Sequence, residues 1–203
     1  DVESLRAAVD DSTAAIVLEP IQGEAGVLVP PDGYLRAARE IADSVGALLI
    51  VDEVQTGIGR TGAWFAHQRD GILPDIVTLA KGLGGGLPIG ACIATGRAAA
   101  LLTPGSHGST FGGNPVSCAA ALAVLAAIED GHLLARAEVV GTVLSTGIVE
   151  RSHGLVVAVR GRGLLLAAVL EAPVAKALEQ AARASGLIVN AVAPDAIRVA
   201  PAL

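Results

Sequence analysis

The sequence predicts an α/β fold, with a mostly parallel sheet covered by helices on both faces and, after it, part of a smaller α+β unit. Two patterns support this prediction. Through the first part of the 203 residues, short apolar runs alternate with amphipathic stretches, as in α/β folds built on a parallel sheet. From about residue 153, strand-like runs follow one another closely, as in antiparallel pairs. The apolar share of 52% is enough for a large core and argues against disorder.

The elements of the first part are predicted from the length of the apolar runs and from the Pro and Gly residues that bound the helices. The run 47–51 is unbroken and apolar, as in a strand buried on both faces. The stretch 31–45 predicts a helix, because Pro31 stands at its start and Gly46 directly after it. Taken in order, these criteria give strands at 14–18, 47–51, 75–80 and 89–95, and helices at 31–45 and 115–128.

The last part of the chain predicts a second, smaller unit. Strand-like runs at 155–160 and 163–170 are separated by two residues, which is hairpin spacing. A helix at 173–185 and two short strands are expected after them. We therefore expect two domains, residues 1–145 and 146–203. The chain has no Met, opens in a helical pattern and ends in a strand-like run, which indicates a piece of a longer chain.

Composition excludes several classes of protein. A net charge of −6, with 14 Lys and Arg against 20 Asp and Glu, argues against a nucleic-acid-binding surface. The longest apolar run, 118–128, is well short of the roughly 18 residues that a membrane helix needs. Cys92 and Cys118 cannot form a disulfide framework, which favours a reducing compartment, so we expect a cytoplasmic protein.

Charged residues directly follow three of the expected strands. Glu19 follows the first, Asp52 and Glu53 the second, and Lys81 the third. Ligands of open α/β sheets bind outside the carboxyl ends of the strands, so these side chains are candidates for one site. Lys81 stands between an apolar strand and glycines, the surroundings of a desolvated lysine, whose neutral amine is a nucleophile toward a carbonyl. The alternative is a structural ion pair between Lys81 and Asp52.

Other chemical motifs are weaker. Lys81 precedes its glycines, so the segment does not match a phosphate-binding P-loop. The segment 57–62 matches the dinucleotide pattern G-x-G-x-x-G, but it does not follow its strand directly or open a long helix, which favours a turn-rich loop. The histidines at positions 67, 107, 132 and 153 lack ligand spacing, so we expect no metal site.

Four short motifs become recognisable when they are taken together and in order: LEPIQGE at 18–24, DEVQTG at 52–57, TLAKG at 78–82 and HGSTFGGNP at 107–115. They resemble the class III, or ornithine-type, pyridoxal-phosphate aminotransferases, and the resemblance extends over essentially the whole chain. The stretches 86–91 and 197–201 are most similar to the acetylornithine branch of that family. The resemblance implies the fold type I large domain, followed by a truncated C-terminal small domain.

The resemblance also implies roles for residues around pyridoxal phosphate. Lys81 matches the lysine that forms a Schiff base with the cofactor, and Asp52 matches the acid that pairs with the pyridine nitrogen. Val54 matches the residue against the ring face, and Gln55 the residue near the phenolic oxygen. Glu53, between Asp52 and Val54, is expected among the cofactor contacts. A protonated pyridine makes the ring an electron sink, which is the chemistry that the acid supports.

Substrate and partner contacts are implied in the same way. Thr110 matches a hydroxyl that reaches the cofactor phosphate of the neighbouring subunit, which implies a homodimer with a shared active site. Ser109 is a candidate substrate contact. Glu24 and Arg198 match a switching pair, in which the arginine binds a substrate carboxylate. Further cofactor contacts are implied in a segment that precedes residue 1.

The implied reaction moves an amino group between N-acetylornithine and 2-oxoglutarate, within arginine biosynthesis. Ornithine or another ω-amino donor is the alternative within the family. Two other classes stay open: a dinucleotide-dependent oxidoreductase that uses residues 57–62, and a non-catalytic remnant that only binds a partner chain.

Overall fold

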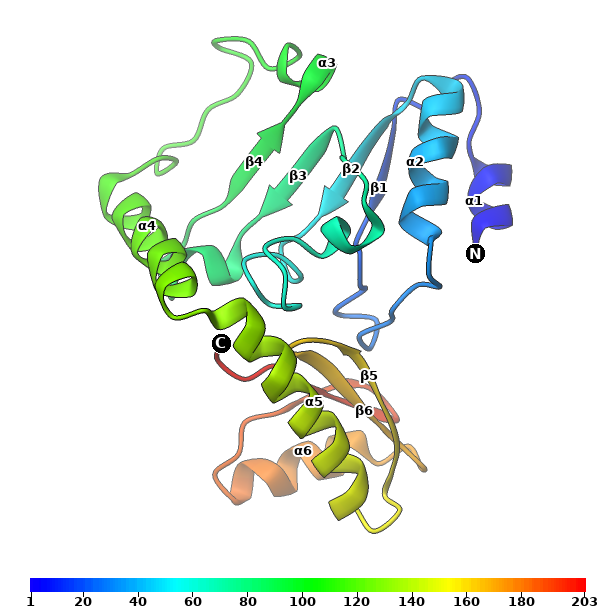
Figure 1. Cartoon of the computed structure of the whole chain (residues 1–203), viewed down its shortest axis with the longest axis vertical. Coiled ribbons are helices and arrows are strands. Elements are labelled where there is room, and N and C mark those ends of the chain that lie inside the picture. Colours follow the sequence, from blue (N-terminus) through cyan, green and yellow to red (C-terminus); the bar gives the residue numbers. More distant parts are fainter.

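The computed structural model describes residues 1–203, which form two separate four-stranded sheets connected by helices (Figure 1). The first sheet has the order β1-β2-β3-β4. Its strands are β1 (Ala15–Leu18), β2 (Leu48–Asp52), β3 (Ile76–Leu79) and β4 (Ala91–Ala94). The first three are parallel, and β4 runs antiparallel to β3. The predicted α/β class with a mostly parallel sheet is confirmed.

Helices cover only one face of the sheet at β1 and β2. α2 (Tyr34–Val45) packs its apolar side on Leu49 and Val51, and α1 (Val2–Ala8) packs beside it. On the opposite face, Val17 is 63% exposed. The prediction that both faces are covered is therefore wrong for this chain, because both of these helices lie on the same side.

Two long helices connect the sheets. α4 (Pro115–Asp130) starts at Asn114, whose side chain accepts a hydrogen bond from the backbone N–H of Ser117 at 2.9 Å. The short α3 (Gly96–Ala99) precedes it. α5 (Leu133–Arg151) was not predicted, because its apolar residues do not gather on one side of the helix. No single helix has the length and apolar character of a membrane span, although α4 and α5, bent by 70°, pass that test as a pair.

The second sheet is antiparallel throughout, with the order β5-β6-β8-β7. Its strands are β5 (Val156–Arg162), β6 (Leu165–Leu170), β7 (Asn190–Ala193) and β8 (Ala196–Val199). The predicted hairpin, β5–β6, is confirmed. α5 and α6 (Ala175–Ala184) share one apolar cluster with this sheet. The predicted domain boundary after residue 145 falls inside α5, and the division into domains stays a prediction.

A close backbone contact joins the two sheets. The N–H of Leu164, in the β5–β6 turn, donates to the carbonyl of Arg60 at 2.9 Å. Gly163 has φ +54, and a Cβ there would lie 2.6 Å from the carbonyl carbon of Thr61. Only glycine therefore lets this turn rest on the loop that follows β2. The contact holds β8 beside the carboxyl edge of the first sheet.

Candidate active site

Asp52 and Lys81 follow neighbouring parallel strands at the same edge of the first sheet. Asp52 ends β2, in register with Thr78 of β3. Lys81 begins the short 3₁₀ helix η2 (Lys81–Gly84), with one residue, Ala80, between it and β3. Its backbone lies in the left-handed region, with φ 46. This conformation is uncommon for residues with a side chain, and it is concentrated at functional sites.

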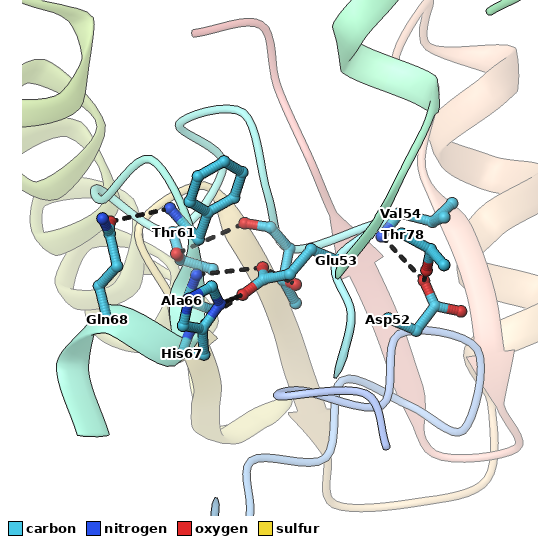
Figure 2. Close-up of polar contacts among 10 residues, drawn as sticks. Asp52, Glu53, Val54, Thr61, Ala66, His67, Gln68 and Thr78 are labelled. Carbon is cyan, nitrogen blue, oxygen red and sulfur yellow. Dashed lines mark hydrogen bonds and ion pairs between the residues drawn. The ribbon is translucent and has the colours of Figure 1, made fainter. Parts of the chain in front are cut away.

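The carboxylate of Asp52 is held on one side only. Its Oδ1 accepts hydrogen bonds from the backbone N–H of Val54 at 2.9 Å and from the hydroxyl of Thr78 at 3.2 Å. Its Oδ2 accepts none from the chain (Figure 2). The carboxylate is thus fixed in orientation by two donors and keeps one oxygen free for a protonated ligand nitrogen.

The side chain of Lys81 is exposed, and no ion pair of the chain includes it. Both expectations for its surroundings, desolvation and a structural ion pair with Asp52, are therefore wrong for this chain. The cause is local geometry: the chain turns at Lys81 into glycines, which have no side chains to cover the amine. The amine is left at a cavity.

The cavity measures about 240 Å³ and lies between the two sheets. It is lined by Glu24, Val54, Gln55, Gly57, Ile58, Arg60, Lys81, Gly82, Leu165, Arg198, Ala200 and Leu203. The lining brings together five residues that the sequence analysis singled out, namely Lys81, Val54, Gln55, Glu24 and Arg198. They come from four separate segments of the chain, so their meeting is a product of the fold.

Glu24 and Arg198 form an ion pair in this cavity. Arg198 Nη1 lies 2.7 Å from Glu24 Oε1, and Gln55 Nε2 donates to the same oxygen at 2.9 Å. The hydrogen bond from Arg198, and after it that from Gln55, holds the pKa of Glu24 below its ordinary value, and the charge of Lys81 adds to this effect. Gly23 leaves room for the Gln55 amide, because a Cβ at position 23 would lie 2.3 Å from Gln55 Oε1 and would displace that side chain.

Glu53 points away from the cavity, into the interior of the loop that follows β2 (Figure 2). Its carboxylate is buried and accepts hydrogen bonds from the backbone N–H groups of Ala66 and His67 at 3.0 and 2.9 Å, and from the hydroxyl of Thr56. His67 Nδ1 lies 2.9 Å from it. β2 ends at Asp52 and the chain turns after it, so the side chains of Asp52 and Glu53 diverge. The structure therefore gives no support to Glu53 as a cofactor contact.

Ser109 and Thr110 lie on an exposed loop between α3 and α4 (Figure 1). The Ser109 hydroxyl accepts a hydrogen bond from the N–H of Gly112 at 3.1 Å, and neither residue lines the cavity around Lys81. The structure thus does not bring Thr110 to the site of its own chain. Its expected role toward a neighbouring subunit stays a prediction.

Sequence reasoning missed two arginine-linked features of the site. Arg60 lines the cavity, and its guanidinium donates to the carbonyls of Leu164 and Pro201. Burial lowers the pKa of Arg60 from its ordinary value. Asn190 accepts a hydrogen bond from Arg198. The only signal for Arg60 in the sequence is that it is a lone arginine in a glycine-rich loop. Asn190 could be found only from the register of its strand, which the sequence does not display.

Two further interpretations can be compared with the structure. The segment 57–62 consists of turns, and only the 3₁₀ helix η1 (Ala66–Asp70) follows it. The turn-rich loop is therefore confirmed, and the dinucleotide-binding arrangement is wrong because no helix opens on these glycines. No group of three or more His, Cys, Asp or Glu side chains is placed to hold a metal ion.

Comparison with known proteins gives a consistent result. The family described as Aminotransferase class-III matches residues 1–203. The acetylornithine aminotransferases of Mycolicibacterium smegmatis and Mycobacterium tuberculosis are 65% and 66% identical over 203 residues, which is all of this chain and 52% and 51% of theirs. The chain thus spans about half the length of the curated relatives it matches.

Solved structures agree in fold. The ornithine aminotransferase of Toxoplasma gondii, in a structure reported with partial occupancy of pyridoxal phosphate at its active site, has a TM-score of 0.92 and 39% identity over 99% of this chain and 49% of its own. The acetylornithine aminotransferase of Elizabethkingia anophelis has a TM-score of 0.91 and 39% identity over 99% of this chain and 53% of its own. With a family match over its whole length and this fold, the chain belongs to the class-III aminotransferases.

Proposed function

We propose that the complete protein is a pyridoxal-phosphate-dependent aminotransferase that moves an amino group between N-acetylornithine and 2-oxoglutarate, within arginine biosynthesis. The observation that supports this most is the site itself: Lys81, in a left-handed backbone conformation, shares a cavity with Gln55, Val54 and the Glu24–Arg198 pair. Relatives named acetylornithine aminotransferase, about two thirds identical over the whole chain, support the choice of substrates.

Class-III aminotransferases use pyridoxal phosphate, and the donor set of this site suits that cofactor. Asp52, which is outside the lining of the cavity that holds Lys81, offers a fixed carboxylate with a free oxygen for a protonated ring nitrogen. Val54 offers an apolar surface and Gln55 an amide donor, both at the cavity that holds Lys81. When bound, the cofactor supplies an electron sink for the bond that is broken at the amino-bearing carbon.

Within this proposal, Lys81 has two tasks. Its Nζ is the point of covalent attachment to the cofactor. With an amino substrate bound, this amine would be the group that moves a proton to or from the carbon that carries the amino group. Because the side chain of Lys81 is exposed at the cavity, the amine can leave its attachment point and remain within reach of the substrate.

Arg198 and Glu24 divide the recognition of substrates between them. In the absence of a substrate carboxylate, Glu24 neutralises the guanidinium of Arg198. A 2-oxo acid with a carboxylate at this position takes the place of Glu24. Arginine suits this exchange, because its planar guanidinium carries several N–H donors, and those on Nη1 can serve either carboxylate.

Ornithine as the amino donor is the second candidate. The ornithine aminotransferase of Toxoplasma gondii has a TM-score as high as the acetylornithine aminotransferase structure does, 0.92 against 0.91, at the same 39% identity. Steady-state kcat/KM values for N-acetylornithine and ornithine, measured on the complete protein, decide between them. We expect N-acetylornithine to be preferred.

We also propose a cytoplasmic homodimer with shared active sites. Apolar side chains on the loop of Thr110 and along α4 are exposed, among them Phe111 at 79% and Val116 at 69%. Exposed large apolar side chains, where they gather on one surface, are typical of interfaces. Thr110, next to Phe111, would then reach the cofactor phosphate held by the partner, and Ser109 would contact substrate.

The attachment of the cofactor to Lys81 gives a direct test. Borohydride reduction of the complete protein should leave the cofactor on the peptide that contains Lys81, as read by mass spectrometry. Lys176, the other lysine of this chain, is the internal control. Lys81→Ala should lose both the label and transamination. A label on Lys176, or an active Lys81→Ala protein, would refute the assignment.

A further inference from the structure

The guanidinium of Arg198 has two nitrogens with different kinds of partner. Nη1 donates to Glu24, to Gln55 at 3.2 Å and to the carbonyl of Gly23 at 3.3 Å. Nη2 donates to Asn190 Oδ1 at 2.8 Å and to no other group of the chain. The Nη1 partners belong to the loops that follow β1 and β2, whereas Asn190 belongs to β7.

Asn190 and Arg198 are held together by the sheet itself. They are register partners on the antiparallel strands β7 and β8. Directly opposed side chains on neighbouring strands lie on the same face and close to one another. Strand pairing, and not the Glu24 loop, therefore sets the contact between Arg198 and Asn190, so we expect it to persist when Glu24 moves.

The two members of the ion pair differ in freedom. The side chain of Arg198 is 19% exposed, whereas that of Glu24 is 70% exposed. In an exchange of carboxylates at Arg198, Glu24 is thus the member that leaves, and the arginine has to stay in place. Once Glu24 has left, Asn190 is the side chain that still fixes the direction of the guanidinium from its own sheet.

We propose that Asn190 is a positioning residue, which holds Arg198 through Nη2 while Nη1 is released from Glu24 to bind a carboxylate of a 2-oxo dicarboxylic acid. This inference rests on the proposed function, in which Arg198 binds that carboxylate. Asn190 acts through Arg198 and touches neither cofactor nor substrate. Its amide is suited to the position because it supplies a neutral acceptor, which does not compete with an incoming carboxylate for the charge of the arginine.

The surroundings of Asn190 agree with a neutral side chain. Glu179, on α6, accepts a hydrogen bond from the N–H of Ala191 at 3.4 Å and is paired with Lys176. The hydrogen bond from Lys176 is the main cause of the lowered pKa of Glu179, and a smaller contribution comes from the side chain of Asn190. The amide oxygen of Asn190 accepts from Arg198, and a neutral side chain here adds no second negative charge near Glu179, whose carboxylate is bonded to the N–H of the next residue, Ala191.

The test measures binding of glutarate, a dicarboxylate without a reactive carbonyl, to the complete cofactor-loaded protein by calorimetry. Asn190→Ala removes the acceptor, and we expect glutarate to bind about 5- to 20-fold more weakly. The KM for 2-oxoglutarate should rise by a similar factor, with little change in kcat. Asp195→Ala is the matched control, because Asp195 is exposed on the same hairpin and its side chain has no hydrogen bond. The Asp195→Ala protein should bind glutarate as tightly as the unaltered protein does.

Arg198→Lys separates this inference from the proposed function. If Arg198→Lys weakens glutarate binding and Asn190→Ala binds like Asp195→Ala, Asn190 has no positioning role, and the carboxylate site at Arg198 stands. If Arg198→Lys also binds glutarate normally, Arg198 is not the carboxylate site, and both the inference and that part of the proposed function are wrong. Weaker binding in both variants, with a normal Asp195→Ala, supports the inference.

Discussion

Asp52 and Glu53 are neighbours in the chain, but their carboxylates lie in opposite surroundings. Asp52 accepts two hydrogen bonds through one oxygen and leaves the other free at the edge of the first sheet. Glu53 is 1% exposed, and both of its oxygens accept hydrogen bonds within the loop that it organises. The carboxylate of Asp52 is thus open to a ligand at the edge of the sheet, whereas that of Glu53 stabilises the loop next to it (Figure 2).

This difference shows how the site is divided between open and closed parts. Lys81, Glu24 and the free oxygen of Asp52 have unused hydrogen-bonding capacity, which a ligand can take up. Glu53 and the loop around it are satisfied and buried, so they gain nothing from a ligand and lose much from substitution. Removing a group from the open part should therefore cost activity, and removing one from the closed part should cost stability.

The largest effect is expected at Asp52. Asn at this position keeps the acceptor for the Val54 N–H and the Thr78 hydroxyl, but it lacks the charge that, under the proposed function, holds a proton on the cofactor's ring nitrogen. We expect Asp52→Asn to lower kcat by about a thousandfold, equivalent to about 4 kcal/mol, while the melting temperature changes little. Kinetics and calorimetry on the same preparation check this. Near-normal turnover would show that Asp52 is only structural.

A substitution at Glu53 should lower the stability of the fold. Glu53→Ala leaves the buried donors of Thr56, Ala66 and His67 without an acceptor, and we expect it to lower the free energy of unfolding by about 3 kcal/mol. Glu129→Ala, an exposed residue without an ion pair, is the control and should change it by less than about 0.5 kcal/mol. Urea unfolding of the complete protein measures both. An equally stable Glu53→Ala protein would contradict the division between open and closed parts.

The positions of the strand ends could be predicted from the sequence, but whether a side chain there belongs to the open or the closed part of the site could not. Strand ends were predictable, because apolar runs mark the strands and the next charged residue must stand at the edge. The direction of each side chain beyond that edge was not, and Glu53 was placed with the cofactor contacts for this reason. The strand ends in the structure at Asp52, and the turn that follows it sends the next side chain into the loop.

The exposed state of Lys81 and the whole of helix α5 were missed for different reasons. The apolar strand and the glycines on either side of Lys81 suggested desolvation, but glycines have no side chains to cover the amine, and burial depends on which distant segments pack over a residue. α5 has no periodic apolar pattern, because it packs on α4, on the second sheet and on the loop after β2, and so uses several sides. Packing of that kind can be read only from the fold.

Thr110 offers an intermediate effect, because it belongs to the open part but is expected to act on the partner subunit. Thr110→Val keeps the shape and removes one hydroxyl donor, so cofactor retention should weaken by roughly 1–3 kcal/mol. The control is Thr103→Val, on the same exposed loop, whose hydroxyl contacts only Ser106. Equilibrium dialysis of the cofactor measures both variants.

Mixing of subunits tests whether the site is shared. A dimer of one Lys81→Ala chain and one Thr110→Val chain has one site with an intact Lys81, and that site receives the intact Thr110 of the other chain. At limiting cofactor, activity should reappear when the two inactive proteins exchange subunits. Exchange that is demonstrated by mass, without any return of activity, would show that Thr110 serves its own chain.

The smallest effect is expected from the charge of Glu24. The pKa of Glu24 is lowered in the folded chain, chiefly by the hydrogen bond from Arg198. A group with a lowered pKa stabilises the fold above its unfolded pKa, and this contribution is lost as the pH falls through the folded value. Because the side chain is 70% exposed and screened by solvent, the contribution should stay below about 1 kcal/mol.

The stability difference between the unaltered protein and Glu24→Gln should therefore be present at pH 6 and vanish toward pH 3, as measured by urea unfolding. Glu171→Gln, an exposed residue without an ion pair, should show no such dependence. A difference that persists at pH 3 would assign the effect to the amide of Gln55 rather than to the charge of Arg198.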